Sequence, residues 1–302
     1  MKFSEIIGNQ DAKEYLIKSI NEKHILHSYL FLGTEGIGKL LIAKEFAKKI
    51  LCLEDSKDDC TCKSCICFNG NNNPDFSLIN ESGDNIKIDT IRDLTSKIIE
   101  KPIVSNRKVY IINDFEKMTK EAQNCLLKTL EEPPEFVTII LISSNENIII
   151  NTIKSRCMTI KFKNIENNIL YNYLINNYKY GEISDNLLKS FDGSLGKALK
   201  LYDNKDKYNQ IDLLIDSLNK NDLFDVMQKA KIIYEKESIF DILDYIIVCL
   251  YSKSFENERF INCIKYVNKC INRLKSNSNF DMSIDNMVIS IWEELNENSN
   301  RC

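Results

Sequence analysis

Short apolar runs alternate with amphipathic segments along the first half of the chain. The runs are rich in Ile, Val, Leu and aromatic residues, which is typical of buried strands, whereas the intervening segments repeat apolar residues at helical spacing. We predict strands at Tyr29–Leu32, Phe76–Ile79, Lys108–Asp114, Val137–Ile142 and Met158–Phe162, and helices at Asp11–Asn21, Leu41–Ala47, Ile88–Glu100 and Lys120–Glu132. This alternation favours a parallel, doubly wound α/β sheet.

The pattern changes after Asn164, where helical spacing takes over. Residues 165–202 indicate three short helices, with Gly181 and Gly193 at the turns. From Lys197 onward the sequence contains neither Gly nor Pro, and its apolar residues form helical stripes of the kind that build a core or a subunit contact. We therefore expect an α/β core at residues 1–163, followed by helical sequence as far as residue 302.

The composition sets limits on partners and location. The 302 residues are 43% apolar, which suffices for a packed core, and the formal net charge is −4. A negative balance argues against a broad basic face that grips nucleic acid, but it leaves room for a local patch. The amino-terminal residues lack a signal-peptide pattern, and the apolar run Ile239–Tyr251 is too short and too charged to span a bilayer. We expect a soluble, cytoplasmic protein with no membrane partner.

A glycine-rich stretch follows the first predicted strand and precedes a helix, which is the context of a phosphate-binding loop. Gly33, Gly36 and Gly38 would let backbone N–H groups point into one concavity at the helix N-terminus. Lys39 stands where such loops place a lysine on the β- and γ-phosphates. The next residue should be Ser or Thr, whose hydroxyl holds Mg²⁺, but it is Leu40. The sequence therefore predicts a nucleotide loop that lacks one ligand.

The strand at residues 108–114 ends in a second departure. In ATPases with this kind of loop, one acid at this point orders Mg²⁺ and the next positions the attacking water. Here the pair is Asn113 and Asp114, and an amide is a poorer ligand for a hard cation than a carboxylate. We expect ATP hydrolysis to be lost and ATP binding to be weak or absent.

Five of the 11 cysteines lie between Cys52 and Cys67. Four thiolates can surround one tetrahedral Zn²⁺, and the spacing of Cys62 and Cys65 lets two thiolates meet one ion. We choose Cys52, Cys60, Cys62 and Cys65 as ligands of a structural zinc, with Cys67 as a spare. The alternative is a set of free or redox-active thiols. A redox pair should open a helix in a thioredoxin-like unit, a context that we do not expect here.

Two strings further along carry a family resemblance. Residues 122–134 read AQNCLLKTLEEPP, and residues 155–157 read SRC. With the string HSYLF before the glycine-rich stretch and the cysteine cluster, they resemble the clamp-loader AAA+ subunits of bacterial DNA polymerase III. The resemblance covers residues 6–200. It implies three domains: an AAA+ core at residues 1–163, a small helical lid at 164–207 and an all-helical collar at 208–302 that assembles a five-subunit ring. Such a ring loads the sliding clamp onto primed DNA in replication.

Clamp loaders contain motor subunits with an intact loop and acidic pair, and a delta-prime class that resembles them but is not an ATPase. Leu40 and Asn113 depart from the motor pattern, and so does Gly196, where motor subunits place an arginine that senses the γ-phosphate. All three departures affect residues that ATP hydrolysis requires. The resemblance thus implies the delta-prime class, an accessory subunit of the polymerase holoenzyme and not an enzyme by itself. The alternative is an active motor subunit, since Lys39 and the glycines remain.

The SRC string makes Arg156 the expected arginine finger, a residue that reaches into a neighbouring subunit's ATP site and stabilises charge on the γ-phosphate. The other interpretation of Arg156 is a surface or intrachain salt bridge. The implied partners are the motor (tau/gamma) and delta subunits in a hetero-pentamer, with the sliding clamp and primed DNA reached through the complex. A zinc scaffold unrelated to replication would explain the cysteines but neither string.

Overall fold

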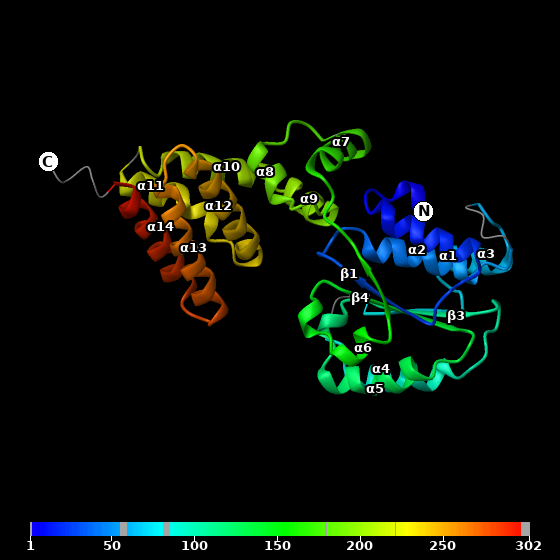
Figure 1. The fold of residues 1–302 in the computed structure, drawn as a ribbon. Helices are drawn as coiled ribbons and strands as arrows, with labels where there is room; N and C mark the ends of the chain where they lie inside the picture. Colours follow the sequence, from blue (N-terminus) through cyan, green and yellow to red (C-terminus); the bar gives the residue numbers. More distant parts are fainter. Residues whose placement is uncertain (1, 55–58, 81–84, 179, 221, 297–302) are drawn as a thin grey trace. The chain divides into compact units, whose positions relative to one another are not determined.

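The computed structural model describes residues 2–54, 59–80, 85–178, 180–220 and 222–296. The chain forms two compact units, each described here by itself (Figure 1). The first comprises Met1–Tyr173 together with Gly193–Gly196, and the second comprises Leu174–Asp192 and Lys197–Cys302. The expected division into three domains at residues 163 and 207 stays a prediction.

A five-stranded parallel sheet forms the centre of the first unit. The strands lie in the order β2-β3-β4-β1-β5. Their bounds are β1 Ser28–Leu32, β2 Phe76–Ile79, β3 Lys108–Ile112, β4 Val137–Ser143 and β5 Met158–Lys161. In a parallel sheet all carboxyl ends share one edge, where loops from distant parts of the sequence meet. The loops after β1, β3 and β4 therefore lie at the same edge.

Alternate side chains of the strands enter two separate cores. On β1, Tyr29 and Phe31 pack on the side of α1 (Gln10–Asn21) and α2 (Lys39–Leu51), whereas Leu30 and Leu32 pack on the opposite side. That opposite side is covered by α4 (Ile88–Ile98) and α5 (Lys120–Glu131). Figure 1 shows α1, α2 and α3 on one face of the sheet and α4, α5 and α6 on the other. Strands covered on both faces must be apolar throughout, which explains the continuous apolar runs.

The predicted α/β elements are confirmed, with small differences. Helix α2 begins at Lys39, so the glycine-rich stretch leads directly into it. Two helices were not predicted: α3 (Lys63–Asn69) and the short α6 (Asn151–Lys154). Both are brief and lack a clear helical stripe, so their sequences gave no periodic signal.

Where the structure describes it, the second unit contains helices and no strand. The three predicted short helices are confirmed as α7 (Asn167–Tyr178), α8 (Asp185–Ser190) and α9 (Leu195–Tyr202). They are followed by α10 (Lys205–Ser217), α11 (Leu223–Ala230), α12 (Ile239–Ser254), α13 (Arg259–Lys275) and α14 (Phe280–Asn296). Asn277 adopts φ 53° between α13 and α14, a left-handed turn for which glycine is usually used. Within the described ranges, no helix combines the length and apolarity needed to cross a membrane.

Candidate functional site

The glycine-rich loop connects β1 to α2 in a tight turn. Gly36 and Gly38 adopt φ 75° and 93°, a region that side chains disfavour, and Gly38 is the residue that precedes the first turn of α2. The loop therefore has the strand, turn and helix N-terminus that a phosphate-binding loop requires. Its position after β1 places it at the carboxyl edge of the sheet.

Lys39 is bound to its own loop. Its side chain is buried, and Nζ donates to the carbonyl oxygens of Gly33 (2.5 Å) and Thr34 (2.6 Å). Burial lowers the pKa of the Lys39 ammonium, and the nearby carboxylates of Glu116, Glu35 and Asp114 oppose this shift. The next side chain, Leu40, packs against the core on the α1–α2 side of the sheet and offers no oxygen. A phosphate at this loop would have to compete with two carbonyls for the ammonium.

A segment far along the chain packs on the same loop. Ser194 Oγ donates to the carbonyl oxygen of Glu35 at 2.8 Å, and Gly196 N donates to that of Gly36 at 3.0 Å. A Cβ atom added to Gly196 would lie 3.0 Å from the Gly36 Cα atom, which is too close for an ordinary contact. A side chain at residue 196 would therefore require the loop backbone at Gly36 to shift by a few tenths of an ångström.

The end of β3 uses its polar groups within the fold. Asn113 Nδ2 donates to the carbonyl oxygen of Asn80 at 3.5 Å, and Asn80 Nδ2 returns a bond to that of Asn113 at 3.3 Å. The Asp114 carboxylate forms an ion pair with Lys117 at 3.2 Å. These contacts tie the end of β3 to the end of β2 and give Asp114 a local partner.

Glu116 was missed in the sequence. Its Oε1 atom accepts hydrogen bonds from the backbone N–H and the hydroxyl of Ser144, which follows β4. Burial raises the pKa of Glu116, but the hydrogen bonds from Ser144 and Ser143 outweigh burial and hold the pKa below its usual value. The carboxylate is thus charged, and among the nearby carboxylates it has the largest effect on the pKa of Lys39. Glu116 and Ser144 are 28 residues apart, so no local pattern indicated the pair.

The four chosen cysteines come together at the far end of α2. Cys52 directly follows the helix, and its Sγ lies 3.5 Å from that of Cys60 and 4.0 Å from that of Cys62. With Cys65, the four sulfur atoms all lie within 4.8 Å of one another, and the half-buried Cys67 is outside the group. Four thiolates around one zinc at 2.3 Å would be separated by roughly 3.8 Å. The thiols therefore fit a tetrahedral zinc site.

One argument about these cysteines was wrong. We did not expect a helix after the Cys62–Cys65 pair, yet Cys62 is the N-cap residue of α3. Burial raises the pKa of Cys62, but hydrogen bonds from the backbone N–H groups of Leu53 and Cys65 outweigh it and lower the pKa to about 7. A thiol that ionises near neutral pH is suited to either metal binding or redox chemistry. The gathering of four sulfurs, and not the absence of a helix, is what favours metal.

Arg156 forms an intrachain ion pair. Its Nη2 lies 2.7 Å from Oε1 of Glu131 at the end of α5, and its Nη1 donates to the carbonyl oxygen of Thr152 at 2.8 Å. The Ser28 hydroxyl holds the backbone by donating to the Arg156 carbonyl oxygen at 2.8 Å. The side chain is 33% exposed. The salt bridge of the second interpretation is thus present, and the guanidinium also reaches solvent.

The family described as "DNA polymerase III, delta subunit" matches residues 8–166, just over half of the 302 residues. The chain belongs to this family. The match covers the glycine-rich loop, the cysteine cluster, the strings at residues 122–134 and 155–157, and all five strands of the sheet. The fold and the two strings were therefore interpreted correctly as those of a DNA polymerase III subunit.

Relatives of two kinds resemble the chain. DNA polymerase III subunit gamma/tau of Mycoplasma pneumoniae is 34% identical over 209 residues, which are 67% of this chain and 30% of the relative. DNA polymerase III subunit delta' of Bacillus subtilis is 35% identical over 161 residues, which are 53% of this chain and 49% of the relative. The chain thus spans half or less of these relatives. Because both subunit names occur, similarity alone does not choose between the two kinds.

A solved structure shares the fold. A DNA polymerase III gamma subunit-related protein of Thermotoga maritima superimposes with a TM-score of 0.53 at 19% identity, covering 94% of this chain and 100% of that chain. At this identity the similarity concerns the fold only. It agrees with the five-stranded parallel sheet of the AAA+ type.

Proposed function

We propose that the chain is a non-hydrolysing, delta-prime-type subunit of a DNA polymerase III clamp loader. The observation that carries this proposal is the packing of Gly196 against Gly36, since a Cβ at residue 196 would lie 3.0 Å from the loop backbone. In the motor subunits that the sequence resembles, this position holds an arginine for the γ-phosphate. Here residue 196 is a glycine that offers no side chain to a phosphate, and its backbone N–H bonds to the Gly36 carbonyl oxygen of the loop.

Two further features support loss of hydrolysis. Leu40 lies in the first turn of α2, where a hydroxyl would hold Mg²⁺, and its side chain packs in the core. At the end of β3, Asn113 bonds to Asn80 and Asp114 pairs with Lys117, so the two Mg²⁺-side positions are an amide and a locally neutralised acid. The changes at Leu40, Asn113 and Gly196 each weaken ATP hydrolysis, and they lie on three separate elements.

The same proposal gives Arg156 a role in a neighbouring subunit. A guanidinium held by a carboxylate and a carbonyl, yet one-third exposed, is oriented and still accessible to an incoming phosphate. We propose that Arg156 contacts the γ-phosphate of ATP bound by the motor subunit, and that Glu131 positions it until then. Fingers of this kind contribute on the order of 10³–10⁵ in rate.

The test uses the chain reconstituted with its cognate motor and delta subunits. Arg156→Ala should abolish the part of the DNA- and clamp-stimulated ATPase that depends on this chain, while the complex still assembles in gel filtration. Arg92→Ala is the matched control, because Arg92 is also an exposed arginine paired with one carboxylate, Asp89. Equal stimulated ATPase in the two variants contradicts the finger.

An active motor subunit is the second candidate. It is favoured by the retained glycines and Lys39 and by the 34% identity to a gamma/tau relative. Mg²⁺-dependent ATP hydrolysis by the purified chain separates the two candidates. Turnover by the chain alone, abolished by Lys39→Ala, establishes the motor; no turnover alone but Arg156-dependent turnover in the mixture supports the delta-prime role.

We also propose that Cys52, Cys60, Cys62 and Cys65 hold a structural Zn²⁺. Four thiolates fill a tetrahedral ion and leave no open position for a reaction, so the metal would serve to fasten the segment after α2. A metal-to-chain ratio of one by elemental analysis, lost in Cys65→Ser, tests this assignment.

The proposed partners follow from the family. They are the motor (tau/gamma) and delta subunits of a hetero-pentamer, with the sliding clamp and primed DNA engaged through the complex. We propose a cytoplasmic location, as for a replication protein of this family. ATP binding by this chain is proposed to be weak or absent, since Lys39 already bonds two carbonyls.

A further inference from the structure

Helix α13 has a one-sided charge pattern. It carries five basic residues and no Asp or Glu over Arg259–Lys275, although acidic residues outnumber basic ones in the whole chain, 44 to 40. Two of the basic residues, Arg273 and Lys275, lie in the last turn, where they complement the helix dipole. Lys265 and Lys269 lie further upstream, where the dipole gives no reason for a cation. The helix end therefore explains only part of the pattern.

Three of the five basic residues line an open, shallow groove of about 680 Å³. Its lining consists entirely of side chains that donate hydrogen bonds: Lys265, Asn268, Lys269, Asn272, Arg273, Ser276 and Ser278. Lys265, Lys269 and Arg273 are each one turn apart, so they form a straight row with a rise of about 6 Å per step. We call these three residues the basic row.

Part of the basic row is neutralised and part is not. Lys265 Nζ forms an ion pair with Glu294 of α14 at 3.1 Å, and the Tyr266 hydroxyl donates to the same carboxylate at 2.8 Å. Lys269 and Arg273 form no ion pair with any carboxylate among the described residues. A smaller polar cavity of about 90 Å³ is also lined by Lys269 and Arg273, together with Tyr266, Asn286 and Ser290. Two cations in the carboxyl-terminal half of α13, Lys269 and Arg273, are thus available to an anion.

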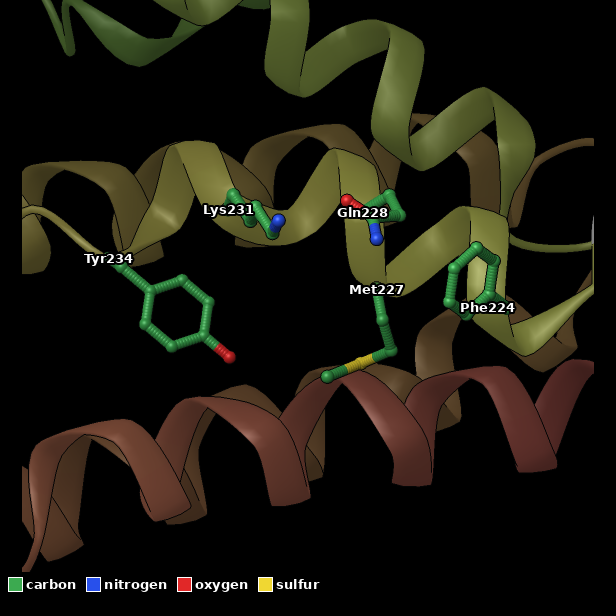
Figure 2. Close-up of a pocket in the computed structure, with 5 residues that line it drawn as sticks. All are labelled: Phe224, Met227, Gln228, Lys231 and Tyr234. Carbon is green, nitrogen blue, oxygen red and sulfur yellow. The ribbon is translucent and has the colours of Figure 1, made fainter.

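Another hollow among the described residues of this unit has a different chemistry. A cavity of about 400 Å³ beside α11 is lined by Phe224, Met227, Gln228, Lys231 and Tyr234. Figure 2 shows Met227 and Tyr234 directed toward the neighbouring helix, with Lys231 lying across its own helix. This surface is mainly apolar, whereas every residue that lines the groove on α13 has a polar side chain.

We propose that the basic row binds the sugar–phosphate backbone of single-stranded DNA. Lys, Arg, Asn and Ser side chains are the groups that contact phosphate oxygens in protein–DNA complexes. Protein–protein interfaces are built around apolar and aromatic side chains, and no residue of either kind lines this groove, which makes an acidic peptide a poorer match than a phosphate backbone. The cations form one row, and the facing residues of α14 are neutral or acidic, so the groove matches one strand and not the two backbones of a duplex. DNA is chosen because the family is one of DNA polymerase subunits.

This inference goes beyond the proposed function, because it concerns a direct DNA contact of the helical unit and needs neither ATP nor Arg156. It is tested with the purified full chain and a fluorescein-labelled oligothymidine, by fluorescence anisotropy at several salt concentrations. The test variant is Lys269→Glu/Arg273→Glu. The control is Lys229→Glu/Lys231→Glu, which reverses the same charge on exposed residues at the end of α11.

The wild type and the control should bind the oligonucleotide with equal affinity, and the test variant should bind at least tenfold more weakly at low salt. The slope of log K against log salt should fall in magnitude by about 1.4, since two phosphate contacts of a single strand are lost. The milder Lys269→Ala/Arg273→Gln should show an intermediate loss, and its melting temperature reports whether the unit stays folded.

Three results would overturn the proposal. They are no binding by the wild type at low salt, equal weakening in test and control variants, and stronger binding to polyglutamate than to oligothymidine. The last result would identify an acidic protein segment as the partner. Equal affinity for a duplex of the same length would also remove the assignment to a single strand. None of these outcomes depends on whether the chain hydrolyses ATP, so a failure here leaves the proposed function to its own test.

Discussion

The two ends of α2 make an instructive pair. At the N-terminal end, the glycine-rich loop keeps the backbone of a phosphate site, but its lysine bonds the carbonyl oxygens of Gly33 and Thr34. At the C-terminal end, four thiols gather within 4.8 Å and bond mainly to one another. At the N-terminal end, the polar groups of the loop bond to one another within the protein. At the C-terminal end, four sulfur atoms lie close enough together to bind one metal ion. A fold can thus preserve the shape of a binding site after its ligands are gone.

The largest effect is expected at the cysteine end. Cys65 is 2% exposed, and Cys65→Ser removes one of four ligands from a buried site. We expect the bound zinc to be lost and the melting temperature to fall by about 10 °C or more, which corresponds to roughly 3–5 kcal/mol for a unit of this size. Differential scanning fluorimetry measures the melting temperature, and elemental analysis measures the bound zinc.

Cys67→Ser is the matched control, since Cys67 belongs to the same segment but lies outside the group. It should retain zinc and melt close to the wild type. Equal melting temperatures for the two variants, with no zinc in either, would show that the four thiols are ordinary core residues.

The next effect is at the loop. Gly36→Ala introduces a Cβ atom that collides with the Ser194 hydroxyl, at a φ of 75° that alanine disfavours. We expect the free energy of unfolding to fall by about 2–3 kcal/mol. Urea titration of the full chain is the measurement. Gly181→Ala is the comparison, because a Cβ there meets its nearest atom at 3.7 Å. A Gly36→Ala variant as stable as Gly181→Ala would mean that the segment at Gly193–Gly196 does not close on the loop in solution.

A smaller loss is expected for Lys39→Met. The substitution leaves the carbonyl oxygens of Gly33 and Thr34 without their donor, and Thr34 lies at the surface where water can replace it. We expect a cost of about 1 kcal/mol in the free energy of unfolding. Stimulated ATPase of the reconstituted loader should be unchanged. A marked loss of that ATPase would give Lys39 a role in nucleotide binding and break the contrast between the two ends.

The smallest effect is expected from restoring the missing ligands. Leu40→Thr/Asn113→Asp supplies a hydroxyl and a carboxylate for Mg²⁺, but Gly196 still packs on the loop. The purified variant should show no Mg²⁺-dependent ATP hydrolysis above the wild type. An ATP hydrolysis rate close to that of a cognate motor subunit would show that Leu40 and Asn113 alone account for the loss of hydrolysis.

The helices and strands could be predicted because their signals are local. The apolar runs of β1, β3 and β4 and the stripes of α4 and α5 repeat over a few residues, and repeats of that length need no knowledge of the fold. The glycine-rich loop and the cysteine cluster were also visible, since their residues are close in sequence. Helix α3 was missed because seven residues with scattered cysteines carry no such repeat.

The candidate sites were completed only by contacts between distant residues. The Ser194–Glu35 bond joins residues 159 positions apart, and the Ser144–Glu116 bond joins residues 28 apart. The Arg156–Glu131 ion pair joins the turn before β5 to the end of α5, which precedes β4. The Ser144–Glu116 bond depends on the pairing of β3 with β4, which brings the loops that follow these strands side by side. Strand order has no local signature, because it results from packing across the whole sheet.

The amino-acid sequence alone determined the doubly wound core, the helical second half, the residues of the loop and cluster, and the departures at Leu40, Asn113 and Gly196. The tertiary structure decided how these residues are used: that Gly196 closes on Gly36 and that Lys39 turns back on its loop. It also decided that the cations of α13 line one groove. The physical reason is that local patterns specify the conformation of each segment, whereas the satisfaction of a buried or charged group depends on whichever distant segment packs beside it.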